Sequence, residues 1–227
     1  MMSKKRSLSQ KINVMRASVM GANDGIVSVA GIVLGVAAAT SNNFAIFISG
    51  ISGMLAGTVS MAMGEFVSVN TQKDSERNAI TTQKQALADS YDNEFNTVKD
   101  KLVTDGISTD LAQQATKEMM AKDPIKTTVR QKYGFTVGEY TNPLSAALAS
   151  MISFPTGSIL PLLAITLFPK PIRIQATFIA VLIALAITGY TAAKLGNANT
   201  RHGIVRNVIS GTLTMIVTFV IGTLIGS

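Results

Sequence analysis

Two carboxylates, Asp24 and Glu65, lie within long apolar stretches of this 227-residue chain. The chain has 13 acidic residues, and all the others fall within residues 71–143. An ionisable side chain is costly inside a bilayer, so one that is retained there marks an ion or substrate pathway facing protein or a water-filled cavity. The pattern therefore predicts a membrane protein that handles cations.

Further metal-ligating groups surround both carboxylates. Asn23 adds an amide oxygen beside Asp24, and Gly25 lets another backbone come close. Hard and borderline divalent cations prefer such oxygen donors. Met61 precedes Glu65 by four residues, so one helical face presents a thioether together with a carboxylate. The sulfur shifts the preference from Mg²⁺ and Ca²⁺ towards softer first-row metals.

The same two acids offer a route for protons. A carboxylate buried without a cation favours its protonated form. Arrival of a metal ion at Asp24 and Glu65 would then expel protons, and protonation would expel the metal, which predicts metal/proton exchange. Structural roles stay open: Met61 as a core gap-filler, and Asp24 and Glu65 in a structural ion pair or near the interface. Glu65 could also reach water at the end of its span.

The polar block at residues 71–143 predicts short helices with narrow apolar faces. A polar helix from Gln72 to about Ser90 is followed by a helix from Tyr91 to Gly106, one after the N-cap Ser108, and a short one ending at Gly134. The expected apolar faces are Phe95, Val98 and Leu102 on the second helix and Leu111, Ala115 and Met119 on the third.

This block also holds a second set of candidate metal ligands. They are acids and methionines near the ends of the expected helices: Asp92, Glu94, Glu118, Met119, Met120 and Asp123. The alternative is a solvated acidic face with the methionines in a small core. The block contains 11 acidic and 10 basic residues, and this near balance argues against a metal-storage role.

Five apolar runs position the first two carboxylates and the polar block. Each run approaches or exceeds the roughly 20 residues that cross a hydrocarbon core: 19–39, 44–69, 143–168, 174–193 and 203–225. We expect an all-α polytopic membrane protein with five transmembrane helices and a small cytoplasmic helical insert. Its parts are a basic cytoplasmic lead-in (1–18), two spans (19–70), the insert (71–142) and three further spans (143–227). The insert is expected to be a metal-binding domain.

Prolines and glycines add detail to these spans. Pro155 and Pro161 predict a kinked or discontinuous third span. Glycines four residues apart permit close helix packing, either within the chain or across a dimer axis. These pairs are Gly31 and Gly35, Gly53 and Gly57, and Gly222 and Gly226.

The net charge of +7 is distributed as in a membrane protein. Basic residues gather before the first span, within the polar block and around the last connection. With five spans and a cytoplasmic N-terminus, all three regions lie on the cytoplasmic side, as the positive-inside rule requires. This distribution argues against nucleic acid as a partner. The chain has no cysteine, nucleophile–base pair or nucleotide loop, so an enzyme is not expected.

Three regions of the chain resemble signatures of the vacuolar iron transporter family. Residues 21–28, Gly-Ala-Asn-Asp-Gly-Ile-Val-Ser, resemble its first-helix motif. Residues 57–69, Gly-Thr-Val-Ser-Met-Ala-Met-Gly-Glu-Phe-Val-Ser-Val, resemble the second. The family's third motif is similar to three short segments of this chain: Asn142–Pro143, Ser153–Phe154 and Leu160–Pro161–Leu162. The likeness follows the whole chain in order and is strongest to the small bacterial branch, without an added ferritin-like domain.

The resemblance implies a five-span homodimer that exports Fe²⁺, often also Mn²⁺, from the cytosol in exchange for protons. The family's transmembrane metal-site aspartate and methionine fall on Asp24 and Met61. Its cytoplasmic metal ligands, a double methionine followed by an acid, fall on Met119, Met120 and Asp123. The chain departs from eukaryotic members in two places. Gly53 occupies the position, two turns before Met61, where those members have a glutamate, and Glu65, one turn after Met61, is expected to substitute for it. Glu76 is the one glutamate in a helix that is rich in glutamate in those members.

Together, the residues and the resemblance predict a divalent-metal transporter in a bacterial cell membrane, with the N-terminus and insert in the cytoplasm. Fe²⁺ or Mn²⁺ would be its substrate, and no cofactor is expected to be permanently bound. Asp24, Glu65, Met61 and Asn23 would form the metal and proton pathway. The alternative is a membrane-anchored metal sensor or interaction protein whose insert binds metal or a protein partner without transport.

Overall fold

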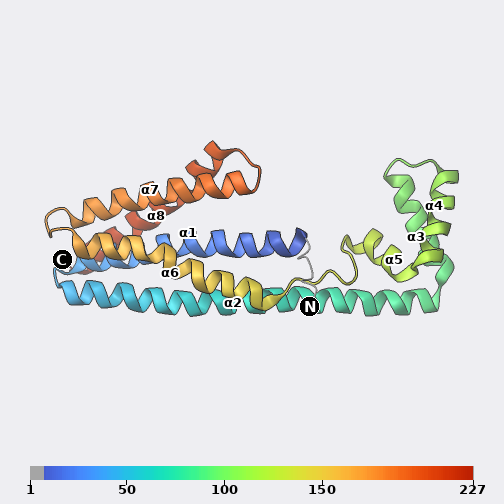
Figure 1. Ribbon diagram of the computed structural model, residues 1–227, viewed down its shortest axis with the longest axis horizontal. Coiled ribbons are helices and arrows are strands. Elements are labelled where there is room, and N and C mark those ends of the chain that lie inside the picture. The colour runs from blue at the N-terminus through green and yellow to red at the C-terminus, as the bar shows by residue number, and fades with distance from the viewer. Residues whose placement is uncertain (1–7, 227) are drawn as a thin grey trace, which may run out of the picture. The chain divides into compact units, whose positions relative to one another are not determined.

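The computed structural model describes residues 8–226 and contains only helices in that range (Figure 1). Five of the helices are long and apolar enough to cross a membrane, which confirms the expected all-α fold with five spans. They are α1 (Leu8–Ala39), α2 (Asn43–Asp89), α6 (Pro143–Leu167), α7 (Arg173–Leu195) and α8 (Thr200–Gly226). The shorter helices are α3 (Tyr91–Thr104), α4 (Thr109–Lys122) and α5 (Pro124–Tyr133).

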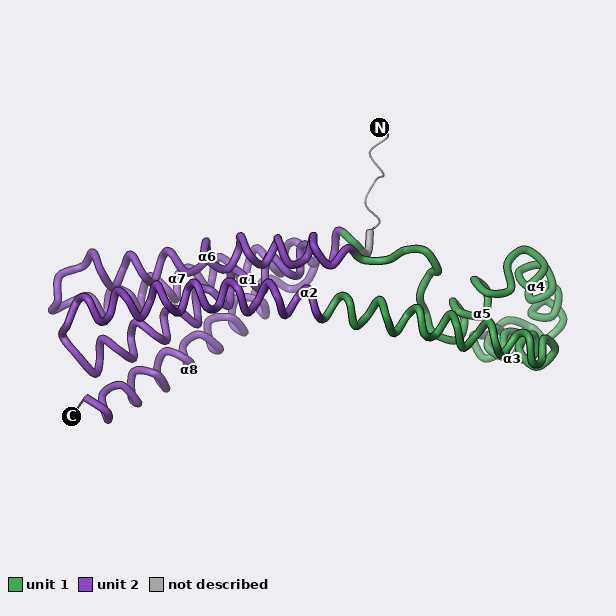
Figure 2. Tube along the Cα trace, turned by 90° about the horizontal axis from the view of Figure 1, so that it is seen from below, with its two compact units in different colours: residues 1–10, 68–141 green, residues 11–67, 142–227 purple. Residues whose placement is uncertain are grey.

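The chain forms two compact units, which Figure 2 colours separately. The membrane unit comprises residues 11–67 and the chain from residue 142 onward. The insert unit comprises residues 68–141 together with the start of α1 up to Gln10. Helix α2 contributes residues to both units.

Helix α1 is the central element of the membrane unit and supplies more of the buried core than any other helix. Its core residues pack against α2, α6, α7 and α8, with Phe154 of α6 and Met215 of α8 among their buried partners. Glycines bring the backbones together: a β-carbon at Gly25 would overlap the carbonyl oxygen of Phe154, and one at Gly222 would overlap that of Gly35. The glycine pairs predicted to mediate close packing therefore make contacts within one chain.

The insert unit is held by a small core in which Val98, Leu102 and Met120 are buried and Phe95 packs beside them. The predicted apolar face of α3 is thus confirmed. The predicted face of α4 was wrong by one position, because Leu111 is 58% exposed. The buried residues of α4 are instead Ala112, Thr116 and Met120, which recur every four residues along the helix.

Two expected helix breaks are absent. The lead-in expected at residues 1–18 is, from Leu8 onward, part of α1, while residues 1–7 lie outside the described range. Similarly, the polar helix expected from Gln72 is a continuation of α2. No proline precedes residue 124, so nothing forces either helix to stop. The third span is also one continuous helix, α6, which contains both Pro155 and Pro161.

Candidate metal pathway

Two contacts fix the relative heights of α1 and α2 in the membrane unit. Arg16 of α1 is ion-paired with Glu65 of α2, and a β-carbon at Gly53 of α2 would meet the side chain of Ile32 of α1. The two helices are therefore antiparallel. Asp24 lies midway between Arg16 and Ile32, and the corresponding midpoint on α2 is residue 59. This register places Asp24 within about 3 Å, along the axis, of the height of Met61.

Asp24 and Asn23 present oxygen atoms at this height. The Asp24 side chain is exposed on the membrane unit, and its Oδ1 accepts a hydrogen bond from Ser28 Oγ at 2.9 Å. Asn23 is half-buried, and its buried Oδ1 has no hydrogen-bond partner among the described residues. Buried polar atoms nearly always have a partner, so the orphan oxygen of Asn23 is available to an external group.

Helix α6 closes the same level from another side. The Phe154 ring would meet a β-carbon at Gly57 of α2, and the Phe154 carbonyl would meet one at Gly25 of α1. Ser158 Oγ donates to the Gly25 carbonyl at 3.2 Å and to the Phe154 carbonyl at 2.8 Å. Met61 is half-buried and packs against the core that contains Phe154. At this level α6 therefore contacts α1 through backbone atoms and α2 through the Phe154 ring.

Glu65 lies one helical turn from Met61 and has a cationic partner. It is 7% exposed, and its Oε2 accepts from Arg16 Nη2 at 3.1 Å. The Arg16 side chain is 44% exposed. Sequence analysis placed Arg16 before the first span and therefore missed this pair. The available signal was that helical sequence continues without interruption from Leu8 to Gly25, which extends α1 past Arg16.

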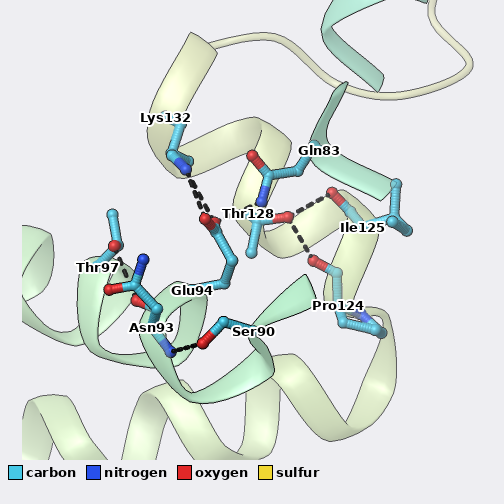
Figure 3. A network of polar contacts seen from close by, with 9 residues as sticks. All are labelled: Gln83, Ser90, Asn93, Glu94, Thr97, Pro124, Ile125, Thr128 and Lys132. Atoms are coloured by element: carbon cyan, nitrogen blue, oxygen red, sulfur yellow. Dashed lines mark hydrogen bonds and ion pairs between the residues drawn. The ribbon is translucent and has the colours of Figure 1, made fainter. Parts of the chain in front are cut away.

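In the insert unit, Glu94 is buried in a polar network (Figure 3). Lys132 Nζ donates to both carboxylate oxygens of Glu94 at 2.9 Å, and Gln83 Nε2 donates to Oε2. These contacts join α2, α3 and α5. The carboxylate of Glu94 is therefore engaged by protein donors, a pairing that spans 38 residues and leaves no local pattern in the sequence.

The other insert candidates fall into two groups. Met120 is 1% exposed in the core, and Asp123 is the N-cap of α5, where Oδ1 accepts from the Lys126 backbone N–H at 2.9 Å. This hydrogen bond, helped by the Lys126 ammonium, lowers the pKa of Asp123 below its ordinary 3.8 despite partial desolvation. The remaining candidates lie at the surface or are half-buried: Glu76, Asp92, Glu118 and Met119.

Two of these surface acids have amide partners one turn away. Gln72 donates to Glu76 at 3.0 Å, and Gln114 donates to Glu118 at 3.4 Å. Within residues 8–226, no three acidic or histidine side chains gather into a group that could hold a metal ion. The structure therefore brings Asp24, Asn23 and Met61 to one level of the membrane unit. It does not gather the acidic candidates of the insert unit into a group.

Comparison with known proteins identifies relatives along nearly the whole chain. The sequence profile of the VIT family matches residues 15–223. Vacuolar iron transporter homolog 2 of Arabidopsis thaliana is 34% identical over 224 residues, covering 96% of this chain and 87% of that protein. The vacuolar iron transporter of Acanthamoeba castellanii is 31% identical over 211 residues, covering 92% of this chain and 78% of that protein.

Proposed function

This chain belongs to the VIT family, and from that premise we propose that it exports Fe²⁺, Mn²⁺ or both from the cytosol in exchange for protons. The family and the five spans make it an integral-membrane metal-ion transporter, not an enzyme. Relatives named as vacuolar iron transporters support iron as a substrate. Softer first-row metals also match the sulfur atom of Met61 at the height of Asp24.

The exposed carboxylate of Asp24 is the observation that carries this proposal. It lies in the middle of a helix long and apolar enough to span the membrane, with no cationic partner among the described residues. A charge in that position is costly unless it faces a pathway or is covered by protein. The adjacent Asn23 oxygen and Met61 thioether supply further ligands of the kinds that Fe²⁺ and Mn²⁺ accept.

A second copy of the chain would complete this site. One chain provides three donors, from Asp24, Asn23 and Met61, whereas octahedral metal ions take about six ligands. The apolar part of α2 is also the least buried of the five spans. It presents an exposed stripe with helical spacing: Leu55, Val59, Met63 and Val67. A homodimer that pairs these faces would cover the stripe and bring two sets of donors together.

Arg16 gives Glu65 a defined role in this scheme. In the absence of metal, the guanidinium neutralises the buried carboxylate. An arriving divalent cation would compete with Arg16 for Glu65, and the half-exposed arginine is free to turn towards water. Glu65 would then act as a ligand one turn from Met61, with Arg16 as its exchangeable counter-ion.

The insert unit would receive metal only weakly. Glu94, Met120 and Asp123 already serve an ion pair, the core and a helix cap. This leaves Glu76, Asp92, Glu118 and Met119 as accessible donors that do not form a preassembled group. The distribution of Lys and Arg supports a cytoplasmic position for this unit and the N-terminus.

The test is transport in proteoliposomes with an imposed pH gradient. We expect Fe²⁺ and Mn²⁺ flux accompanied by opposite proton movement, and at least about a tenfold lower rate for Asp24→Asn. Glu139→Gln is the matched control, because it neutralises an exposed acid of the insert unit and should leave transport unchanged. Full transport by Asp24→Asn would reject the site. Metal binding to intact protein without flux would favour the sensor.

A further inference from the structure

A cavity of about 350 Å³ lies where the start of α2, the end of α6 and the start of α7 meet. All its walls belong to the membrane unit. Its polar lining includes Asn43, Thr166, Lys170 and Arg173, and the remaining walls are mostly apolar. The metal pathway does not use this cavity, because Asn43 is 22 residues, or about 33 Å of helix, from Glu65.

Arg173 is a buried cation without an anionic partner in the described chain. It is 6% exposed, and its Nη1 donates to Asn43 Oδ1 at 2.8 Å. That acceptor is a neutral amide, and no other hydrogen bond or ion pair of the guanidinium occurs among residues 8–226. Arginine does not lose its proton in proteins, and a buried charge needs a counter-charge. The buried guanidinium is therefore suited to bind an anion.

The membrane unit cannot supply that anion from its own side chains. Asp24 and Glu65 are its only acidic residues. Asp24 precedes Ala39, the end of α1, by 15 residues, or about 22 Å of helix. Glu65 is farther still along α2 and is already paired with Arg16. No acidic side chain of this unit is therefore within reach of Arg173.

We propose that the cavity binds a phosphate group. A guanidinium matches phosphate with two parallel N–H···O bonds, and the Lys170 ammonium adds a second positive charge at the same wall. The buried arginine and the neighbouring lysine thus select the same ligand chemistry.

The position of the cavity makes a phospholipid headgroup one natural source of this phosphate. It lies at the ends of three candidate spans, the level at which headgroups meet protein. Phe47 and Phe168 line it and are 44% and 45% exposed, so their rings can contact acyl chains. Inorganic phosphate is the other source, since it has the same oxygen atoms without the chains.

The experiment measures binding to the delipidated full-length protein by native mass spectrometry. The probes are phosphatidylglycerol, diacylglycerol with the same chains, and inorganic phosphate. We expect phosphatidylglycerol to bind at least about tenfold more tightly than diacylglycerol. Arg173→Gln should remove most of this difference, and Lys170→Gln, at an exposed position, should reduce it less. Arg201→Gln is the matched control, because it removes an exposed arginine near another helix start.

Each outcome decides the proposal. Headgroup-dependent binding that falls in both cavity variants but not in the control supports a lipid phosphate, while equal binding of inorganic phosphate with the same variant pattern supports the free ion. If Arg173→Gln does not fold, the exposed Lys170→Gln variant alone carries the test. The assignment is overturned if Lys170→Gln and any folded Arg173 variant bind both phosphate-containing probes as tightly as the wild type does.

Discussion

Arg16 and Glu65 are 49 residues apart in sequence, yet they form the one ion pair within the described membrane unit. Their geometry gives the proposed pathway an internal cation that would compete with metal for the same carboxylate. The free energy of this competition is modest, because an ion pair with a half-exposed partner contributes at most about 1 kcal/mol. Such a value suits a contact that must break during each transport cycle.

Replacing Arg16 should therefore tighten metal binding. We expect Arg16→Gln to increase the affinity for Mn²⁺ by about fivefold, which is the equivalent of about 1 kcal/mol. Calorimetric titration of the purified protein measures this change. Arg201→Gln, which removes an exposed arginine without an ion pair in the described chain, should leave the affinity unaltered. An unchanged or weaker affinity in Arg16→Gln would mean that Glu65 has only a structural role.

The buried carboxylate of Glu94 leads to a different expectation, loss of stability. Glu94→Gln removes the charge that Lys132 neutralises, and it should destabilise the insert unit by about 2 kcal/mol. Hydrogen exchange at the backbone amides of α3 and α5 should accelerate by roughly 30-fold. Adding Lys132→Met should restore part of the protection, because no unpaired charge remains. Glu118→Gln, at an exposed acid, is the control, and equal exchange in both single variants would contradict the role of this pair.

At the scale of secondary structure, Asp123 ends one helix and begins the next. It is the C-cap of α4 and the N-cap of α5. Asp123→Ala should weaken α5 by about 1 kcal/mol and speed exchange of its first-turn amides about fivefold, whereas Asp123→Asn should keep the cap. Hydrogen exchange resolved by peptide measures both variants. Faster exchange in Asp123→Asn than in Asp123→Ala would exclude a capping role.

The same cap predicts a pH dependence. Its hydrogen bonds lower the pKa of Asp123 in the folded state, so the carboxylate stabilises the fold fully above the ordinary value of 3.8. This contribution is lost as the pH falls through the lowered pKa. The difference between wild type and Asp123→Ala should therefore be constant from about pH 7 to about pH 5 and shrink below about pH 3.

The elements show which features are readable from sequence. Apolar length predicted all five spans, and Gly134, with a positive φ of 74°, ended α5 as expected of a glycine cap. The face of α4 was missed, because the stripe through Ala115 and Met119 fits the helical period as well as the buried stripe through Thr116 and Met120 does. The partners of Glu65 and Glu94 were missed because tertiary contacts between distant residues leave no periodicity in the sequence.

For the whole molecule, the exposed stripe on α2 predicts where two copies meet. The chain has no cysteine, so a single introduced thiol reports on its own contacts. We expect Val59→Cys to form a disulfide-linked dimer in native membranes, because residue 59 lies on the stripe at the height of Asp24. Ile183→Cys on α7 is the matched control, since Ile183 is similarly exposed on another helix. Equal cross-linking at both positions, or none at residue 59, would contradict a dimer through α2.

The glycine contacts have a consequence for movement. A β-carbon at Gly189 would lie 2.6 Å from the carbonyl oxygen of Gly203, and similar backbone contacts join α1 to α6 and α1 to α8. At its own glycines, Gly50, Gly53 and Gly57, helix α2 instead meets only side chains, which can change rotamer and let a helix slide. We therefore expect the other four spans to keep their positions relative to one another. During alternating access, α2 would slide along its axis and carry Met61 and Glu65 past Asp24, which α1 holds in place.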